Sequence, residues 1–229
     1  MKIGVLTAMD SEYAQLASLM DDKKVCEDER GFRYTIGNMG ANQLILRQCG
    51  IGKVNAAIGA AELIRTYSPD CMISTGVAGG IDKCLDVMDV VVSTGIVYHD
   101  VWCGMGCEKG QVQGMPLCFK SEERLYSAAS KLTPENVKIH LGLICTGDQF
   151  ITSRDELDKI KADFPDGLAV DMESAAIAQT CHIYGVPFVS FRIISDTPGA
   201  DGHQQQYENF WATLANNSFG VTRDFLAMI

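Results

Sequence analysis

The sequence has few basic residues: 19 Lys and Arg stand against 29 Asp and Glu, which gives a formal net charge of −10. Such a surface repels phosphate backbones and anionic lipid headgroups. No apolar run is long enough to cross a bilayer, which takes about 20 consecutive apolar residues. We therefore expect no nucleic acid and no membrane among the partners.

Paired cysteine motifs are also absent. The nine cysteines occur singly, without a CxxC pair, and the N-terminus has no apolar stretch with a small-residue cleavage site. Reduced thiols in the cytosol fit this pattern best, so we expect a cytoplasmic protein. Cys103 and Cys107 follow His99, but no second pair completes a four-ligand metal set. We expect both cysteines to be buried as small apolar side chains, with no metal.

The chain is long enough for one large core, because it has 229 residues of which 47% are hydrophobic. We expect a single domain over residues 1–229. Apolar, β-branched runs predict strands at residues 2–7, 33–37, 43–48, 71–75, 89–96, 138–146, 168–170 and 187–194. Helical spacing predicts helices at residues 11–20, 53–67, 121–132, 153–164, 173–184 and from about Tyr207 onward.

The alternation of these elements predicts an α/β fold, a three-layer α/β/α sandwich. The turn-rich residues 38–42 between two strand-like runs predict a hairpin, so the central twisted sheet should be mixed. Residues 76–80 are rich in glycine and predict a tight loop at a strand end. Residues 98–118 form the longest stretch without a clear period, which is typical of a loop that serves a site or a subunit contact.

Polar residues gather just after several predicted strands, where ligands bind in open α/β sheets. These places are residues 8–12, 76–80, 146–151, 171–173 and 195–196. If the topology brings these strand ends to one rim, two or three carboxylates share a cleft with Met and Phe side chains. This combination suits a nucleoside.

Each of these polar groups also has an ordinary structural explanation. Glu12 could favour a helix N-terminus through the dipole, worth roughly 0.3–1 kcal/mol. Asp171 could cap the following helix, and Asp196 could close a turn with Ser195. The glycine run lacks the Lys and Ser/Thr of a phosphate-binding P-loop. Taken singly, none of these positions establishes a site.

Seven stretches together carry a resemblance that runs nearly from end to end. They are Lys2-Ile3-Gly4 through Ala8-Met9-Asp10-Ser11-Glu12, Gly50-Ile51-Gly52-Lys53-Val54, Thr75-Gly76-Val77-Ala78-Gly79-Gly80, Tyr98-His99-Asp100, Gly147-Asp148-Gln149-Phe150-Ile151, Val170-Asp171-Met172-Glu173 and Arg192 to Asp196. In these the sequence resembles the bacterial 5'-methylthioadenosine/S-adenosylhomocysteine nucleosidases, within the wider nucleoside phosphorylase fold. The resemblance implies hydrolysis of the N-glycosidic bond of an adenine nucleoside, without a metal or an organic cofactor.

The resemblance also implies roles for individual residues. Asp196 is expected to face the purine and donate a proton toward N7, while Ser195 helps to hold its carboxyl group. Protonation requires that burial keep Asp196 neutral near pH 7. Glu12 is expected to polarise the attacking water with Arg192 nearby, and Glu173 to accept hydrogen bonds from the ribose hydroxyls. Two carboxyl groups then flank an oxocarbenium-like centre, as in sugar hydrolases.

The remaining expected contacts are apolar or made by the backbone, and plain core packing would explain the same residue types. Phe150 should stack on adenine, the backbone of Ile151 should read its edge, and Met172 should pack beneath the sugar with Gly79 close by. The thioether pocket should use Met9, Ile51 and Tyr207. As in the family, residues of the 98–118 loop should come from a second subunit, so a homodimer is expected.

Three departures from the family pattern concern the substrate. Val77 stands where many relatives have a serine, Gln113 replaces a proline, and residues 102–105 form an unusual, slightly shortened loop. These positions lie around the expected sugar and 5'-substituent sites, so they bear on substrate identity more than on reaction type. A nucleosidase for another 5'-substituted adenosine, such as 5'-deoxyadenosine or aminodeoxyfutalosine, is one alternative.

Two further alternatives are a phosphorolytic purine nucleoside phosphorylase and a non-catalytic nucleoside-binding protein. The loops at residues 50–52 and 76–80 contain no arginine that would hold phosphate beside the ribose, which favours water as the nucleophile. Glu12, Glu173 and Asp196 are all present, which favours catalysis over binding alone.

Overall fold

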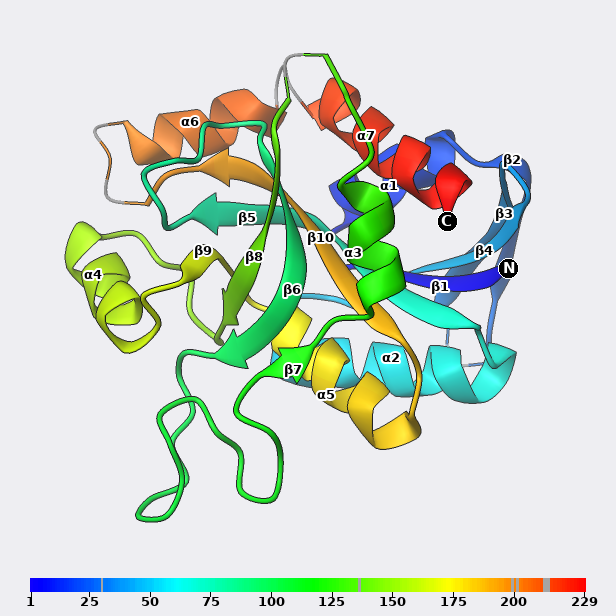
Figure 1. Ribbon diagram of the computed structural model, residues 1–229. Coiled ribbons are helices and arrows are strands. Elements are labelled where there is room, and N and C mark those ends of the chain that lie inside the picture. Colours follow the sequence, from blue (N-terminus) through cyan, green and yellow to red (C-terminus); the bar gives the residue numbers. More distant parts are fainter. Residues whose placement is uncertain (30, 136, 199, 201, 212–214) are drawn as a thin grey trace.

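A mixed β-sheet runs through the molecule and carries helices on both faces (Figure 1). The computed structural model describes residues 1–229 except 30, 136, 199, 201 and 212–214. The strands are β1 (Lys2–Thr7), β2 (Asp21–Glu27), β3 (Arg33–Met39), β4 (Asn42–Gln48), β5 (Cys71–Gly80), β6 (Val90–Tyr98), β7 (Phe119–Lys120), β8 (Ile139–Thr146), β9 (Gly167–Asp171) and β10 (Phe188–Asp196). The helices are α1 (Asp10–Ser18), α2 (Lys53–Tyr67), α3 (Glu123–Ala129), α4 (Arg154–Asp163), α5 (Ser174–Tyr184), α6 (His203–Asn209) and α7 (Ala215–Met228).

The order of the strands is β10-β6-β8-β9-β5-β1-β4-β3-β2, and β10 also pairs with β5. Strands β5, β10, β6, β8 and β9 therefore close into a ring, a closure that the sequence did not predict. Parallel pairs such as β1–β5 and β8–β9 stand beside antiparallel pairs such as β3–β4 and β6–β10. The predicted mixed sheet is confirmed.

The sheet is buried on both faces, because successive side chains of its central strands alternate between two apolar clusters. Leu6 of β1 and Met72 of β5 pack with α2 and α5, whereas Val5 and Ile73 pack with α1, α3 and α7. Figure 1 shows α2 and α5 side by side on one face, with α1 and α7 on the other. This arrangement confirms the predicted α/β fold with helical layers on both sides.

The glycine-rich residues 76–80 belong to strand β5, so the predicted tight loop is wrong. They pair with β10 and β9, where Gly79 is opposite both Val170 and Asp196. A Cβ on Gly79 would lie 2.9 Å from Cγ of Pro198. Glycine is therefore needed here for close approach of neighbouring segments within a strand, and not for a turn.

Three further expectations need correction. Strand β2 was not predicted, because its highly charged sequence is mostly exposed at the edge of the sheet, where charge protects against further strand pairing. The helical segment at the C-terminus begins at His203, before Tyr207, and residues 212–214 of the predicted helix lie outside the described residues. Cys103 is exposed and Cys107 is only half-buried, so neither is a buried apolar side chain.

Two expectations about metals and membranes were tested within the described residues. That part of the chain contains no group of three or more His, Cys, Asp or Glu side chains placed to hold a metal ion. In the same ranges, no helix combines the length and the apolar character needed to span a bilayer.

Candidate active site

The ends of β1, β5, β9 and β10 meet around a cavity of about 120 Å³, together with the segment that follows β8. Eleven of the twelve predicted site residues line it: Met9, Glu12, Ile51, Gly79, Phe150, Ile151, Met172, Glu173, Ser195, Asp196 and Tyr207. The twelfth, Arg192, is buried among the carboxyl groups of the site. Lining residues that were not assigned to the site are Ala8, Val77, Ala78, Gln149, Val170, Asp171 and Pro198.

Glu12 lies in the first turn of α1 and is only 1% exposed. Its Oε2 accepts hydrogen bonds from the backbone N–H groups of Ala8 (2.9 Å) and Met9 (3.0 Å), and its Oε1 accepts one from Val77 (2.9 Å). Glu12 thus satisfies the helix N-terminus as its ordinary explanation requires, and the same bonds fix its carboxyl group at the cavity. Burial raises its pKa, while the positive charge of Arg192 and the three N–H groups oppose the rise.

Strand β5 passes directly beneath this carboxyl group at Gly76. A Cβ at position 76 would lie 2.3 Å from Oε1 of Glu12 and 2.9 Å from Nη1 of Arg192. The lack of a side chain therefore allows the acid and the arginine to approach the same stretch of backbone.

Arg192 projects from β10 and is 1% exposed. Its Nε lies 2.8 Å from Oδ2 of Asp171, its Nη2 lies 3.8 Å from Oε2 of Glu173, and Nη2 donates to Oγ of Ser74 (2.7 Å). A buried guanidinium is tolerated only when it is paired and hydrogen-bonded. Arg192 thus supplies the positive charge that lets several carboxyl groups share one buried site.

Asp171 ends β9 and connects Arg192 to the start of α5. It accepts hydrogen bonds from Oγ1 of Thr146 (2.5 Å) and from the hydroxyl and N–H groups of Ser174. The ordinary explanation of Asp171 as a cap of the following helix therefore holds. Asp171 also lines the cavity, with its charge directed to the guanidinium.

Glu173 is held by the N-terminus of α2. Its Oε1 accepts the N–H of Gly52 (2.9 Å), and the next N–H, that of Lys53, donates to Oδ1 of Asp148 (2.8 Å). Free N–H groups at a helix N-terminus stabilise carboxylates in this way. Burial nevertheless raises the pKa of Glu173, with Arg192 acting in the opposite direction.

Asp196 ends β10 and is 3% exposed. Its Oδ1 accepts a hydrogen bond from Oγ of Ser195 (2.5 Å), as expected, and its Oδ2 lies 2.8 Å from Nε2 of His203. Burial raises the pKa of Asp196, and the contacts with Ser195 and His203 oppose the rise. His203 was not predicted for the site, because it follows no strand and fits no motif.

Aromatic and thioether side chains form the apolar side of the cavity. The Phe150 ring is 53% exposed, and its centroid lies 5.8 Å from that of Tyr207 in an edge-on arrangement. The Tyr207 hydroxyl reaches Sδ of Met9 at 3.8 Å. This side presents flat and polarizable surfaces to a ligand whose polar groups would face the carboxyl side.

Glu12 and Asp196, two of the three site carboxyl groups whose pKa values burial raises, have different surroundings. Glu12 accepts three backbone hydrogen bonds and feels Arg192, which favours its anionic form. Asp196 has no arginine among the groups that shift its pKa, so burial favours its neutral form. Contacts that favour the anion at one carboxyl group more than at the other are the means by which a site divides the roles of base and acid between two carboxyl groups. The site therefore suits cleavage of a bond that needs a proton on one side and an activated nucleophile on the other.

Known proteins similar to this chain define both its superfamily and its family. The chain belongs to the phosphorylase superfamily, whose sequence model matches residues 2–227. It is 43% identical to the 5'-methylthioadenosine/S-adenosylhomocysteine nucleosidase of Actinobacillus succinogenes over 99% of both chains. It is 40% identical to the enzyme of that name from Pseudoalteromonas translucida, over 95% of this chain and 93% of the relative.

Solved structures agree with this result. The nucleosidase of this name from Colwellia psychrerythraea, in complex with adenine, superposes with a TM-score of 0.92 at 38% identity, covering 100% of this chain and 95% of that one. The Neisseria meningitidis enzyme, in complex with methylthio-immucillin-A, gives a TM-score of 0.93 at 36% identity, covering 100% and 99%. The chain is therefore a member of the 5'-methylthioadenosine/S-adenosylhomocysteine nucleosidase family, and the resemblance found in the sequence is confirmed.

Proposed function

We propose that this enzyme hydrolyses the N-glycosidic bond of 5'-methylthioadenosine and S-adenosylhomocysteine, releasing adenine and the 5-thio-substituted ribose. The names of the relatives and the adenine complex of a similar structure support the substrate class. The observation that carries the reaction type is the placement of Glu12 and Asp196, two buried carboxyl groups with different surroundings, on one cavity.

In the proposed mechanism, Asp196 gives its proton to N7 of the purine while Ser195 holds the carboxyl group. The C1'–N9 bond breaks, its electron pair goes to the purine, and positive charge grows on the sugar. Glu173 accepts hydrogen bonds from the ribose hydroxyls and stabilises that charge. Glu12 takes a proton from the water whose oxygen bonds to C1', and the positive charge of Arg192 acts toward the anionic form that this step needs, against the rise in pKa caused by burial.

The apolar residues position the substrate. Phe150 stacks on adenine with its half-exposed ring, and the backbone of Ile151 reads the purine edge. Met172 packs beneath the sugar, and Gly79 leaves room because it has no side chain. The 5'-thio group fits against three further lining residues, Met9, Ile51 and Tyr207.

Water is favoured over phosphate as the nucleophile by the charges around Glu12. Arg192 is engaged by Asp171 at 2.8 Å and lies 3.8 Å from Glu173. A phosphate ion placed beside the ribose would therefore meet carboxylates whose positive partner is already occupied. Neutral water meets no such repulsion.

The test is an incubation of the purified protein with methylthioadenosine in phosphate-free buffer, with and without added phosphate. Adenine and free methylthioribose are expected at equal rates in both buffers. A strict phosphate requirement would make the enzyme a phosphorylase. Release of adenine only from 5'-deoxyadenosine or aminodeoxyfutalosine would support the alternative nucleosidase, and binding without release from any of these would support the binding protein.

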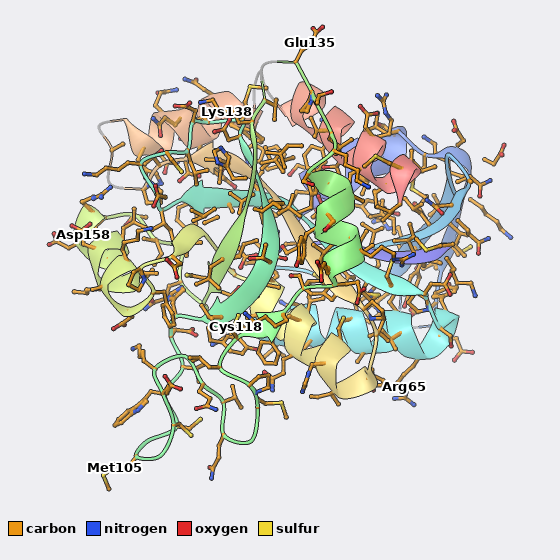
Figure 2. All side chains as sticks on the ribbon, in the orientation of Figure 1. Arg65, Met105, Cys118, Glu135, Lys138 and Asp158 are labelled. Carbon is orange, nitrogen blue, oxygen red and sulfur yellow. The ribbon has the colours of Figure 1, made fainter. Side chains whose placement is uncertain are left out.

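We also propose a homodimer in which the loop at residues 98–118 completes the neighbouring site. Its base is fixed, because Tyr98 donates to Gln179 of α5 and Asp100 pairs with Lys53 of α2. Its tip projects away from the body, with Met105 fully exposed (Figure 2) and Trp102 65% exposed. The start of α2 adds exposed apolar side chains at Ile51, Val54 and Ile58. Exposed apolar side chains gathered in this way are typical of protein interfaces.

The substitution Val54→Asp tests the dimer. The Val54 side chain is 70% exposed. A negative charge at this position should be unfavourable in an apolar interface, so the variant should shift toward monomer, with at least a tenfold rise in the dimer dissociation constant. Light scattering across a concentration series measures this. Val25→Asp is the matched control, because Val25 is 62% exposed on edge strand β2. Equal behaviour of both variants would reject α2 as the interface.

The proposed compartment is the cytosol, and the proposed organisation is one domain over residues 1–229. Nine unpaired cysteines support a reducing compartment. The pairing of β1 with β5 supports one domain, because it joins the ring of strands to the β1-β4-β3-β2 side of the sheet.

A further inference from the structure

His203 contacts the proposed general acid but is not among the residues that line the cavity. Its Nε2 lies 2.8 Å from Oδ2 of Asp196 as an ion-pair contact, and this nitrogen is buried without a hydrogen-bonding partner among the described residues. The imidazole is 8% exposed and does not line the cavity, whereas Asp196 does. The carboxyl group therefore lies between His203 and the space for the substrate.

Helix α6 is fixed in a way that keeps this contact. Gln206, one turn after His203, accepts the backbone N–H of Thr197 through Oε1 (3.0 Å), directly after the end of β10. Tyr207, on the same helical face, reaches Met9 on the other side of the cavity. The His203 ring also packs against Phe150, with 6.1 Å between centroids. Two contacts thus hold helix α6, and a third, with Phe150, holds the imidazole itself.

On the basis of the proposed function, we propose that His203 is a positioning residue that tunes the acid: its unpartnered Nε2–H, 2.8 Å from Oδ2 of Asp196, donates to the carboxylate that forms when the proton passes to the purine and stabilises it. Ser195 does the same at Oδ1. Burial alone would make Asp196 a reluctant donor, because it disfavours the anion that proton transfer leaves behind. A donor on each oxygen offsets that cost at the moment when the charge appears.

The other polar and charged groups around Asp196 do not replace this donor. Ser195 serves the other oxygen, and Arg192 on the same strand is directed to Asp171 and Glu173. Glu12 on α1 and Tyr207 on α6 are acidic side chains, so each is either neutral or negatively charged. Neither therefore adds positive charge near Asp196. His203 is thus the group placed to favour the anionic form at Oδ2.

The direction of the pH effect follows from this role. A donor to the carboxylate favours the charged form and lowers the pKa of Asp196, so its removal raises that pKa. Activity needs the neutral acid and falls as pH rises through its pKa. In His203→Leu, the alkaline limb of kcat/KM should therefore move up by about one pH unit, as for loss of one hydrogen bond to a charged group. At pH values below the alkaline limb, the weaker acid should also lower kcat about three- to tenfold, with KM little changed.

The experiment compares pH profiles of His203→Leu and His203→Gln with the wild-type enzyme. Gln carries an N–H donor at a similar reach but cannot ionise, so it should restore both the limb and kcat to within about twofold. Gln205→Leu, on the exposed side of α6, is the control for the helix itself. Carbon-13 titration of the Asp196 carboxyl group gives the same pKa shift without any assay of activity.

Two results would overturn the tuning role. One is a lower kcat in His203→Leu with an unmoved alkaline limb and an unmoved Asp196 titration, which would mean that His203 is only structural. The other is failure of His203→Gln to restore the profile. Neither result would contradict the proposed function. That function is contradicted instead if the wild-type enzyme releases no adenine or if Asp196→Asn retains full activity.

Discussion

Replacement of Asp196 by Asn is expected to lower kcat for adenine release by about 10³-fold or more, within the 10²–10⁴-fold range of general acid catalysis. The amide has the same shape and still meets Ser195 and His203, but it has no acidic proton to give to the purine. Because the proposed stacking on Phe150 and the proposed contacts to the sugar would remain, KM should change much less. Steady-state assays of adenine release measure both constants.

The matched control is Asp158→Asn, the same chemical change on the exposed face of α4, where Asp158 pairs with Arg154 one turn away. We expect activity within twofold of the wild type. Thermal unfolding of both variants shows whether each is folded. Retention of more than a tenth of the wild-type kcat by a folded Asp196→Asn enzyme would remove Asp196 from the role of acid.

The acid–base assignment depends on the order in which the two carboxyl groups titrate. Burial raises the pKa of both, but Glu12 accepts three backbone hydrogen bonds and feels Arg192. For Asp196, the rise in pKa is opposed only by the contacts with Ser195 and His203. The working form, with Asp196 neutral and Glu12 anionic, is lost as pH rises through the pKa of Asp196 and as pH falls through that of Glu12. The position of the arginine, near Glu12 and away from Asp196, acts in the direction that this proposed form requires.

The strand ends that carry the site were predictable because their signals are local. Lys2–Thr7 and Phe188–Asp196 are apolar runs followed by acids, and a strand buried on both faces reads as such a run. Helix α2 begins and ends as predicted, since small and apolar side chains recur at helical spacing up to Ser68-Pro69.

The features that were missed depend on tertiary contacts. Gly76 and Gly79 are strand residues because Glu12, Arg192 and Pro198 occupy the space where a side chain would be, and nothing local distinguishes this from a turn. The pairing of β10 with both β5 and β6, which closes the ring, joins segments more than 90 residues apart. His203 contacts Asp196 because of the direction in which α6 runs, and the spacing of apolar residues in the sequence does not predict that direction.

Replacement of Arg192 by Met is expected to destabilise the protein by about 3–5 kcal/mol at neutral pH, the range found when one partner of a buried ion pair is removed. Methionine fills much of the volume but leaves Asp171 and Glu173 without their cation. Glu173, whose pKa burial already raises against the effect of Arg192, should then have a still higher pKa in the folded protein than in the unfolded chain. A raised carboxyl pKa costs stability as pH rises, so the loss should be smaller at pH 5 than at pH 8. Denaturant unfolding at the two pH values measures this.

Arg47→Met is the matched control, because Arg47 is also 1% exposed but lies away from the cavity. Its carboxylate partner, Glu62, is 22% exposed and can be hydrated when the arginine is lost. We therefore expect a smaller loss of stability and a weaker dependence on pH than for Arg192→Met. A second substitution, Asp171→Asn in the Arg192→Met background, should restore part of the stability at pH 8, since it removes one uncompensated buried charge. If the loss at Arg192 were the same at both pH values and unchanged by Asp171→Asn, the arginine would act through packing alone, and the charge balance inferred for this site would be wrong.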